Sequence, residues 1–154
     1  LGNKVKTFKE FAASTMPQIY GLDKLEKATH YKVHNFASLI LMNKGNGKFE
    51  TQELPIEAQF SPTLSIAVAD INNDGFLDIY GVGNIYDAEV ETIRYDASKG
   101  YILLGNKEGK FNFLNDNSYF NDNENKAIKQ IIINEILHFI TLNKNNFLSI
   151  LKVK

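Results

Sequence analysis

The chain has 154 residues, of which 44% are hydrophobic and 23% are charged, and its formal net charge is -1. This length and composition predict one globular domain, or part of one, and not a disordered chain. The small net charge and the lack of a basic run exclude nucleic acid as an expected partner, and no apolar run is long enough for membrane insertion. Without cysteine, neither a disulfide framework nor a thiolate metal site is possible.

The N-terminal part, residues 1–36, is predicted to be a helical segment. Thr7 followed by Glu10 has the pattern of a capping box, and apolar residues then recur at helical spacing, so we expect a helix from Thr7 to about Tyr20 that ends at Gly21. Pro17 lies inside this pattern and is expected to split or kink the helix.

A second short helix is expected to begin at Asp23 and to run towards His30. Glu26, His30 and His34 are spaced by four residues, which is the spacing of a zinc site on one helix face. The favoured interpretation is that they bind no metal, because residues 31–33 between the two histidines look extended.

Short apolar runs separated by Gly and Asn replace the helical pattern after Asn35, which predicts strands. Residues 37–42 and 48–54 flank an Asn46-Gly47 pair, the pattern of a tight hairpin. A connector bounded by prolines, residues 54–62, then leads to the next sheet.

An internal repeat organises the remainder of the chain. Residues 38–49 and 100–111 align without gaps at an offset of 62 residues, and both stretches end in Gly-Lys-Phe. This repeat predicts units of four strands. The complete unit has strands at 64–69, 77–83, 100–105 and 110–114 with an insertion at 85–99, and the last unit has strands at 127–133, 137–142 and 147–153.

The fold class that follows is mainly β, with about two and a half four-stranded units. Residues 37–154 would form these repeats. The helical segment 1–36 would be an insertion within a truncated unit.

Oxygen-bearing side chains alternate around one glycine in residues 70–78, which is the spacing of a calcium loop. Hard divalent cations prefer six to eight oxygen ligands, and Gly75 permits the sharp turn that wraps a short loop around the ion. The expected ligands are the side chains of Asp70, Asn72, Asp74 and Asp78 and the backbone carbonyl of Phe76.

The loop differs from an EF-hand, because its twelfth position is Gly81 and strands flank it on both sides. The alternative is a hairpin turn without metal, since Asp, Asn and Gly also favour turns. Calcium is favoured because three carboxylates within nine residues repel one another unless a cation lies between them. The corresponding turn of the last unit, residues 134–136, lacks the ligand spacing and is expected to bind no calcium.

These residues resemble the FG-GAP/VCBS repeats of integrin α-subunit-type β-propellers, in which such loops bind calcium between the first two strands of a blade. The pattern is most similar to bacterial VCBS and ASPIC/UnbV-type surface proteins. That similarity rests on Leu54-Pro55, Ala58-Gln59, Ser61-Pro62 and Gly83-Asn84-x-Tyr86.

The resemblance implies that the units are β-propeller-type blades, about two and a half of them in residues 37–154, as a single domain or as a fragment of a larger propeller. The helical segment 1–36 would then be an insertion within a truncated blade. The resemblance also implies a calcium-binding repeat module of an extracellular, periplasmic or cell-surface protein, with roles that range over adhesion and ligand recognition. Residues 1–7 are not a signal peptide, so any export signal would lie outside this sequence. The implied partners are a protein or glycan ligand, together with the remaining blades of the parent protein or a second copy of the chain.

The insertion contributes a possible recognition loop through Tyr86, Glu91, Arg94 and Tyr95, since Tyr and Arg are favoured at binding hot spots. The alternative is a solvated loop in which Glu91 and Arg94 pair across one turn. Gly81-Val-Gly83 is not read as a nucleotide loop, because no helix follows it. Residues 115–125 are predicted to be an exposed connector.

The leading functional hypothesis is a non-enzymatic module in which calcium has a structural role. No catalytic residue is assigned, because the chain has no activated His, no Cys and no nucleophile elbow. The alternative is an accessory domain of a carbohydrate-active or other hydrolytic enzyme, with Glu89 or Glu91 as an acid or base.

Overall fold

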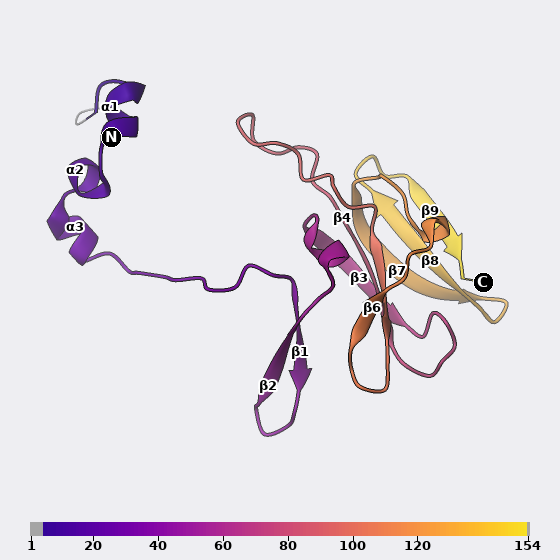
Figure 1. Ribbon diagram of the computed structural model, residues 1–154. Coiled ribbons are helices and arrows are strands. Elements are labelled where there is room, and N and C mark those ends of the chain that lie inside the picture. Colours follow the sequence, from indigo (N-terminus) through magenta and orange to yellow (C-terminus); the bar gives the residue numbers. More distant parts are fainter. Residues whose placement is uncertain (1–4, 154) are drawn as a thin grey trace. The chain divides into compact units, whose positions relative to one another are not determined.

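The computed structural model describes residues 5–153 (Figure 1). Internal contacts divide the chain into two units, Leu1–Phe36 and Ala37–Lys154. The boundary coincides with the predicted change from helical to strand-forming sequence, and the assignment of the two units as separate domains stays a prediction.

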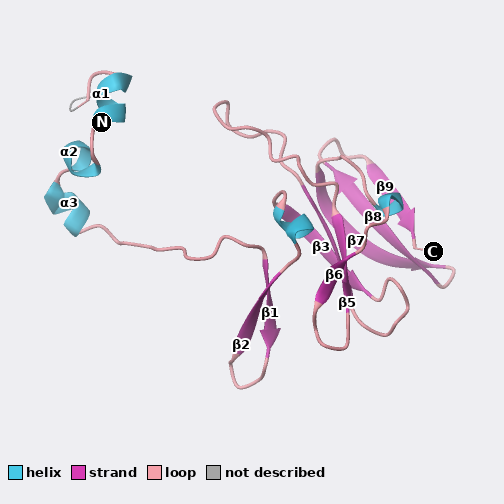
Figure 2. Ribbon diagram, in the orientation of Figure 1, coloured by secondary structure: helices cyan, strands magenta, loops and turns pink. Residues whose placement is uncertain are grey.

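The first unit contains three short helices, α1 (Phe8–Ala13), α2 (Met16–Tyr20) and α3 (Leu22–Glu26) (Figure 2). The predicted capping box forms at α1, where the Glu10 N–H donates to Thr7 Oγ1 over 3.1 Å and the Thr7 N–H donates to Glu10 Oε2 over 3.2 Å. The predicted helix is split ahead of Pro17, which lies in the first turn of α2, where a missing N–H costs no helical hydrogen bond.

The expectation that the second helix runs towards His30 is wrong, because α3 begins at Leu22 and ends at Glu26. His30 and His34 follow in extended chain and share no helix face with Glu26. Within residues 5–153, no group of three or more His, Cys, Asp or Glu side chains could hold a metal ion.

The second unit is built from antiparallel strands. The strands are β1 (Leu39–Asn43), β2 (Phe49–Glu53), β3 (Thr63–Ala69), β4 (Asp78–Gly83), β5 (Tyr101–Gly105), β6 (Phe111–Phe113), β7 (Asn125–Ile133), β8 (Ile136–Asn143) and β9 (Leu148–Lys152). Two short 3-10 helices, Ile56–Gln59 and Asn117–Tyr119, lie in the connections.

These strands form a two-stranded sheet β1-β2, a four-stranded sheet β3-β4-β5-β6 and a three-stranded sheet β7-β8-β9. Consecutive strands are neighbours in each sheet, which is the connectivity of a propeller-type blade. The mainly β class is confirmed, and the repeat is also visible in the structure, because β1 and β5 occupy positions that differ by the predicted 62 residues.

The two inner strands of the four-stranded sheet, β4 and β5, are buried on both faces within the second unit. On one face, β3 and β4 lie against β7, and Tyr80 and Ile102 form a core cluster with Ile128 and Phe139. The rings of Tyr80 and Phe139 meet edge to face, with centroids 5.1 Å apart and planes at 87°. The opposite face buries Ile79, Tyr101 and Leu103 together with Ala58, and Ile40 of β1 and Leu54 pack against that cluster.

Two outer surfaces of this unit expose large apolar side chains. Leu64, Ile66 and Val68 of β3 are 39 to 54% exposed, and Leu148 and Ile150 of β9 are 66% and 62% exposed. Apolar surface of this kind is typical of contact faces. That further blades of the parent protein or a second copy of the chain cover it stays a prediction.

The connector before β3 approaches the sheet closely at Gly83, the last residue of β4. A Cβ atom at this position would lie 1.8 Å from the carbonyl oxygen of Pro62, which is backbone and cannot move aside alone. We expect Gly83→Ala to lower the free energy of unfolding by about 1 to 3 kcal/mol or more, the usual range for overpacking. Chemical denaturation measures this change.

The matched control is Gly47→Ala, in the hairpin between β1 and β2. A Cβ atom there meets nothing within 4 Å, so its cost is confined to the left-handed backbone at φ +71°. Equal destabilisation by the two variants would contradict the close approach at Gly83.

The buried hydroxyl of Tyr80 leads us to expect that the folded chain loses stability in alkaline solution. Burial, together with the nearby Tyr119, raises the pKa of Tyr80 to about 12, and its hydroxyl donates to the Tyr119 carbonyl oxygen. Because the folded pKa is higher than the unfolded value of about 10, this stabilising contribution is complete below pH 10 and is lost as the pH rises to 12. Melts across this window should show a shallower decline for Tyr80→Phe than for the parent chain.

The control for this experiment is Tyr31→Phe, which removes a phenol whose residue is 90% exposed. A decline that is equally steep in Tyr80→Phe and in Tyr31→Phe would assign the alkaline loss of stability to other groups.

Candidate functional site

The predicted calcium loop connects β3 to β4, and its first side chain, Asp70, accepts hydrogen bonds from two backbone N–H groups of the turn. Asp70 Oδ1 accepts the N–H of Asp74 over 3.0 Å, and Asp70 Oδ2 accepts the N–H of Gly75 over 2.8 Å. Gly75 has φ +88°, in the left-handed region where glycine carries no Cβ penalty. The glycine of the motif therefore makes the sharp turn that the sequence predicts.

The next two polar positions continue this pattern of side chain to backbone bonds. Asn72 Oδ1 accepts the N–H of Asp74 over 3.1 Å, and Asp74 Oδ1 accepts the N–H of Phe76 over 2.9 Å. The Asn72 amide nitrogen also donates to Asp74 Oδ2 over 2.8 Å. The three side chains are exposed or half-buried and are held within one loop.

Asp78, the ninth position of the motif, is completely buried as the first residue of β4. Its Oδ2 accepts the N–H of Ile71 over 2.7 Å, and its Oδ1 accepts the N–H of Gly105 over 2.8 Å. Within residues 5–153, no ion pair involves this carboxylate. Buried carboxylates in proteins are normally paired with a cation or coordinate a metal, so this environment is unusual for a charged group.

The ligand atoms that the motif offers suit calcium in their chemistry, because each side chain of the motif supplies a carboxylate or an amide oxygen. Its arrangement is less complete. Within the described residues no three His, Cys, Asp or Glu side chains gather in a way that could hold a metal, so Asp70, Asp74 and Asp78 do not converge on one point. The loop has the predicted turn, and the calcium site stays a prediction.

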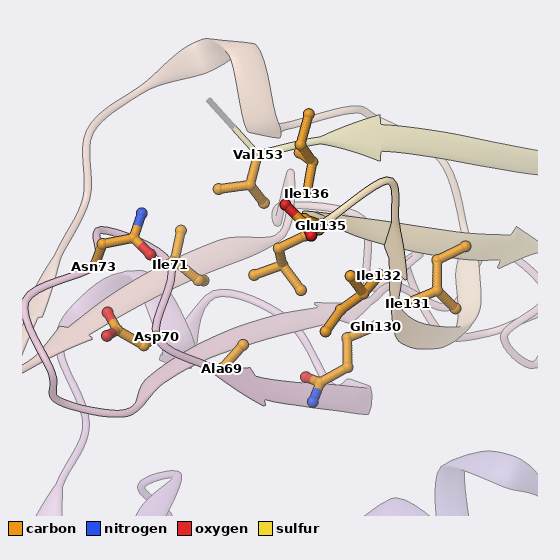
Figure 3. A pocket seen from close by; sticks show the side chains of 11 residues that line it. Ala69, Asp70, Ile71, Asn73, Gln130, Ile131, Ile132, Glu135, Ile136 and Val153 are labelled. Carbon is orange, nitrogen blue, oxygen red and sulfur yellow. The ribbon is translucent and has the colours of Figure 1, made fainter.

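The same loop forms one wall of a cavity of about 780 Å³, shown in Figure 3. Ala69 at the end of β3 and Asp70, Ile71 and Asn73 of the loop line one side, and residues of the β7-β8 hairpin and Val153 line the other side. The hairpin turn contributes Glu135, which has φ +65°. Asn134 and Glu135 form a tight two-residue turn here, and the expectation that this turn binds no calcium stays a prediction.

The insertion after β4 projects from the sheet as an arm (Figure 1), and its base is closed by two sets of hydrogen bonds. Asn84 is buried, and its side chain donates to the carbonyl of Ser98 over 2.7 Å and accepts from the Ser98 N–H over 3.3 Å. Further out, Ile85 and Tyr95 form an antiparallel bridge. These contacts hold the two strands of the arm together where it leaves the sheet.

Two of the four predicted recognition residues come together on this arm. The Arg94 guanidinium lies over the ring of Tyr86, 5.6 Å from its centroid, at a distance where a cation and an aromatic ring attract. The Tyr86 hydroxyl donates to the carbonyl of Asp122. Burial, followed by the charges of Asp96, Asp122 and Glu124, raises the pKa of Tyr86, so the hydroxyl keeps its proton at neutral pH.

The other two predicted residues are placed differently. Tyr95 is 44% exposed, and its backbone takes part in the bridge to Ile85 and accepts from Ser61 Oγ. Glu91 is exposed, and the alternative pairing of Glu91 with Arg94 is wrong, because no such ion pair occurs among the described residues.

A polar pocket that the sequence did not predict lies at the base of the arm, with a volume of about 210 Å³. We call it the Glu124 pocket, and its lining residues are Tyr86, Asp87, Arg94, Asn123, Glu124, Asn143, Lys144 and Asn145. Lys144 forms ion pairs with Asp87 and, at 3.9 Å, with Glu124 Oε2.

Residues 115–125 are less exposed than predicted. Tyr119, Glu124 and Asn125 are buried, and β7 already begins at Asn125. Glu124 was missed because it lies in a run of Asn and Asp that is typical of solvated loops. The glycines of Gly81-Val-Gly83 lie inside β4.

None of the helices in residues 5–153 is both long and apolar enough to cross a membrane.

Comparison with known families gives one match. The model of the FG-GAP-like repeat matches residues 35–81, which span the β1-β2 hairpin, β3, the complete loop with its five predicted ligands and the first strand residues of β4. No curated protein and no solved structure matches the chain. The match supports the repeat family that the loop and the hairpins predict, and it does not extend to a VCBS or ASPIC/UnbV-type relative.

Proposed function

We propose that the second unit is a non-enzymatic, calcium-binding repeat module of an exported or cell-surface protein, in which calcium stabilises the fold. Asp70, Asn72, Asp74 and Asp78 would hold the ion together with the Phe76 carbonyl. FG-GAP-like repeats are typically non-catalytic and typically extracellular, which agrees with this assignment.

The observation that carries the proposal is the environment of Asp78. Its side chain is completely buried and accepts two backbone N–H groups, and no cationic side chain pairs with it within residues 5–153. Two neutral donors compensate only part of the cost of burying a charge, so a nearby cation would stabilise this arrangement. The motif supplies further oxygen donors a few residues upstream, where such a cation would bind.

The proposed role of the module is recognition of a protein or glycan ligand through the arm after β4. Support comes from the ordered base of the arm, where Asn84 and Ser98 exchange two hydrogen bonds, and from the pairing of Tyr86 with Arg94. Preorganised loops lose less conformational entropy when they bind, and Tyr and Arg are enriched where binding energy concentrates.

The calcium proposal predicts that thermal stability depends on calcium and on Asp74. For the full chain, calcium at a hundred times its dissociation constant would raise the free energy of unfolding by about 2.7 kcal/mol relative to excess chelator. Asp74→Ala removes one carboxylate of the loop and should abolish most of this calcium response. Thermal melts of both chains, with millimolar calcium and with chelator, measure the difference.

The matched control is Asp96→Ala, which removes an exposed carboxylate of the arm and should keep the full response. A melt of the parent chain that is the same with calcium and with chelator would rule out a structural calcium ion. A full calcium-dependent stabilisation of Asp74→Ala would contradict the proposed set of calcium ligands.

A further inference from the structure

The Glu124 pocket contains a buried acceptor without a donor. The Glu124 side chain is only 3% exposed, and its Oε1 accepts from the ammonium group of Lys126. Its Oε2 is buried and has no hydrogen bond partner among the described residues, and Lys144 Nζ lies 3.9 Å away from it. A buried carboxylate oxygen without a donor is costly, so this atom favours a ligand that donates a hydrogen bond.

The charges that line the pocket are balanced, which restricts the ligand further. Asp87 is paired with Lys144, and Glu124 is paired with Lys126, while the Arg94 guanidinium lies over Tyr86. A metal ion would compete with the ammonium of Lys144, and an anion would meet two carboxylates. Electrostatic complementarity therefore favours a neutral ligand.

The remaining polar groups favour hydroxyl groups. The lining combines carboxylates that only accept, cationic groups that only donate, and three asparagine side chains that do both, Asn123, Asn143 and Asn145. A hydroxyl placed between Lys144 Nζ and Glu124 Oε2 would accept from the first and donate to the second, across the 3.9 Å that separates them. A ligand that carries several hydroxyl groups matches such a lining.

The position of the pocket also suits a terminal sugar. Three separate connections build its wall, namely the arm after β4, the segment before β7 and the turn between β8 and β9. The hydroxyl of Tyr86 already donates to the carbonyl of Asp122, so its ring is held at the wall and offers an apolar surface beside the polar groups. A volume of about 210 Å³ lies below the usual range for drug-sized ligands, about 300 to 1,000 Å³.

We infer that the Glu124 pocket binds one neutral, polyhydroxylated ring, the terminal sugar of an uncharged glycan. This inference rests on the recognition role proposed above and specifies its ligand class. The calcium loop takes no part in it, because none of its five predicted ligands lines the pocket.

The test measures binding of the labelled full chain, in millimolar calcium, to an array of immobilised neutral, sialylated and sulfated glycans. Titration calorimetry with the preferred free monosaccharide then distinguishes recognition of the sugar from recognition of a longer glycan. We expect binding to neutral glycans only. Glu124→Gln should weaken it at least tenfold, because the variant loses the carboxylate that accepts from both the ligand and Lys126.

The matched control is Glu108→Gln, which removes an exposed glutamate that pairs with Lys110 at 3.5 Å in the β5-β6 turn and should bind as the parent chain does. Asn145→Ala provides a second pocket variant on an exposed turn, where unfolding is not expected, and it should weaken binding several-fold. Thermal melts of each variant verify that it is folded.

Binding confined to sialylated or sulfated glycans, or equal binding by the parent chain and both pocket variants, would overturn the inference. No binding to any glycan would also overturn it, since an ordered water would then satisfy Glu124 Oε2. These outcomes are separate from the calcium proposal, because the calcium-dependent melt of the same parent chain is measured without any glycan.

Discussion

The carboxylate of Asp78 is the interaction on which the arrangement of the complete blade depends. It accepts the N–H of Ile71, just after β3, and the N–H of Gly105, at the end of β5, while Asp78 itself begins β4. One buried side chain thus links three consecutive strands through their backbones. Gly105 is part of the same constraint, because a Cβ atom there would lie 2.3 Å from the carbonyl oxygen of Leu77. A side chain at Gly105 would force apart the backbones that the Asp78 carboxylate holds together.

The connection between β7 and β8 shows that this type of unit is also built without such a loop. Asn134 and Glu135 form a two-residue turn with φ +50° and +65°, and β7 pairs with β8 up to Ile133 and Ile136. The strands of that hairpin need no polar side chain to hold them in register, since a tight turn sets the register directly. The longer loop between β3 and β4 has no such two-residue turn. It is ordered by side-chain oxygens that accept hydrogen bonds from the backbone N–H groups of the loop itself. Asp70 and Asp78 already fix part of the loop through hydrogen bonds to backbone N–H groups, and a bound ion would stabilise this conformation further.

Local patterns explain why much of the fold was predictable. The gapless offset between β1 and β5 and the Asp-x-Asn-x-Asp-Gly spacing of the loop are properties of short stretches, so they placed most strands within a residue or two. The Glu124 pocket depends on tertiary contacts instead, because Glu124 is buried by groups such as Lys144 that lie far along the chain. The alternative pairing of Glu91 with Arg94 assumed one turn of helix. The Ile85-Tyr95 bridge instead makes the arm hairpin-like, and residues three apart do not share a face there.

The two candidate sites lie at opposite ends of one strand. β4 begins with Asp78 of the loop and ends with Gly83, directly before Asn84 at the base of the arm, and all six of its residues are buried. A strand that is buried along its whole length is held by close packing, and this packing constrains both of its ends. Under the proposed function, an ion bound beside Asp78 would therefore hold the segment from which the arm leaves the sheet. The base of the arm would then lose its conformational entropy when the chain folds, and ligand binding would not have to order it again. A structural ion and a recognition arm on the same strand are therefore physically compatible.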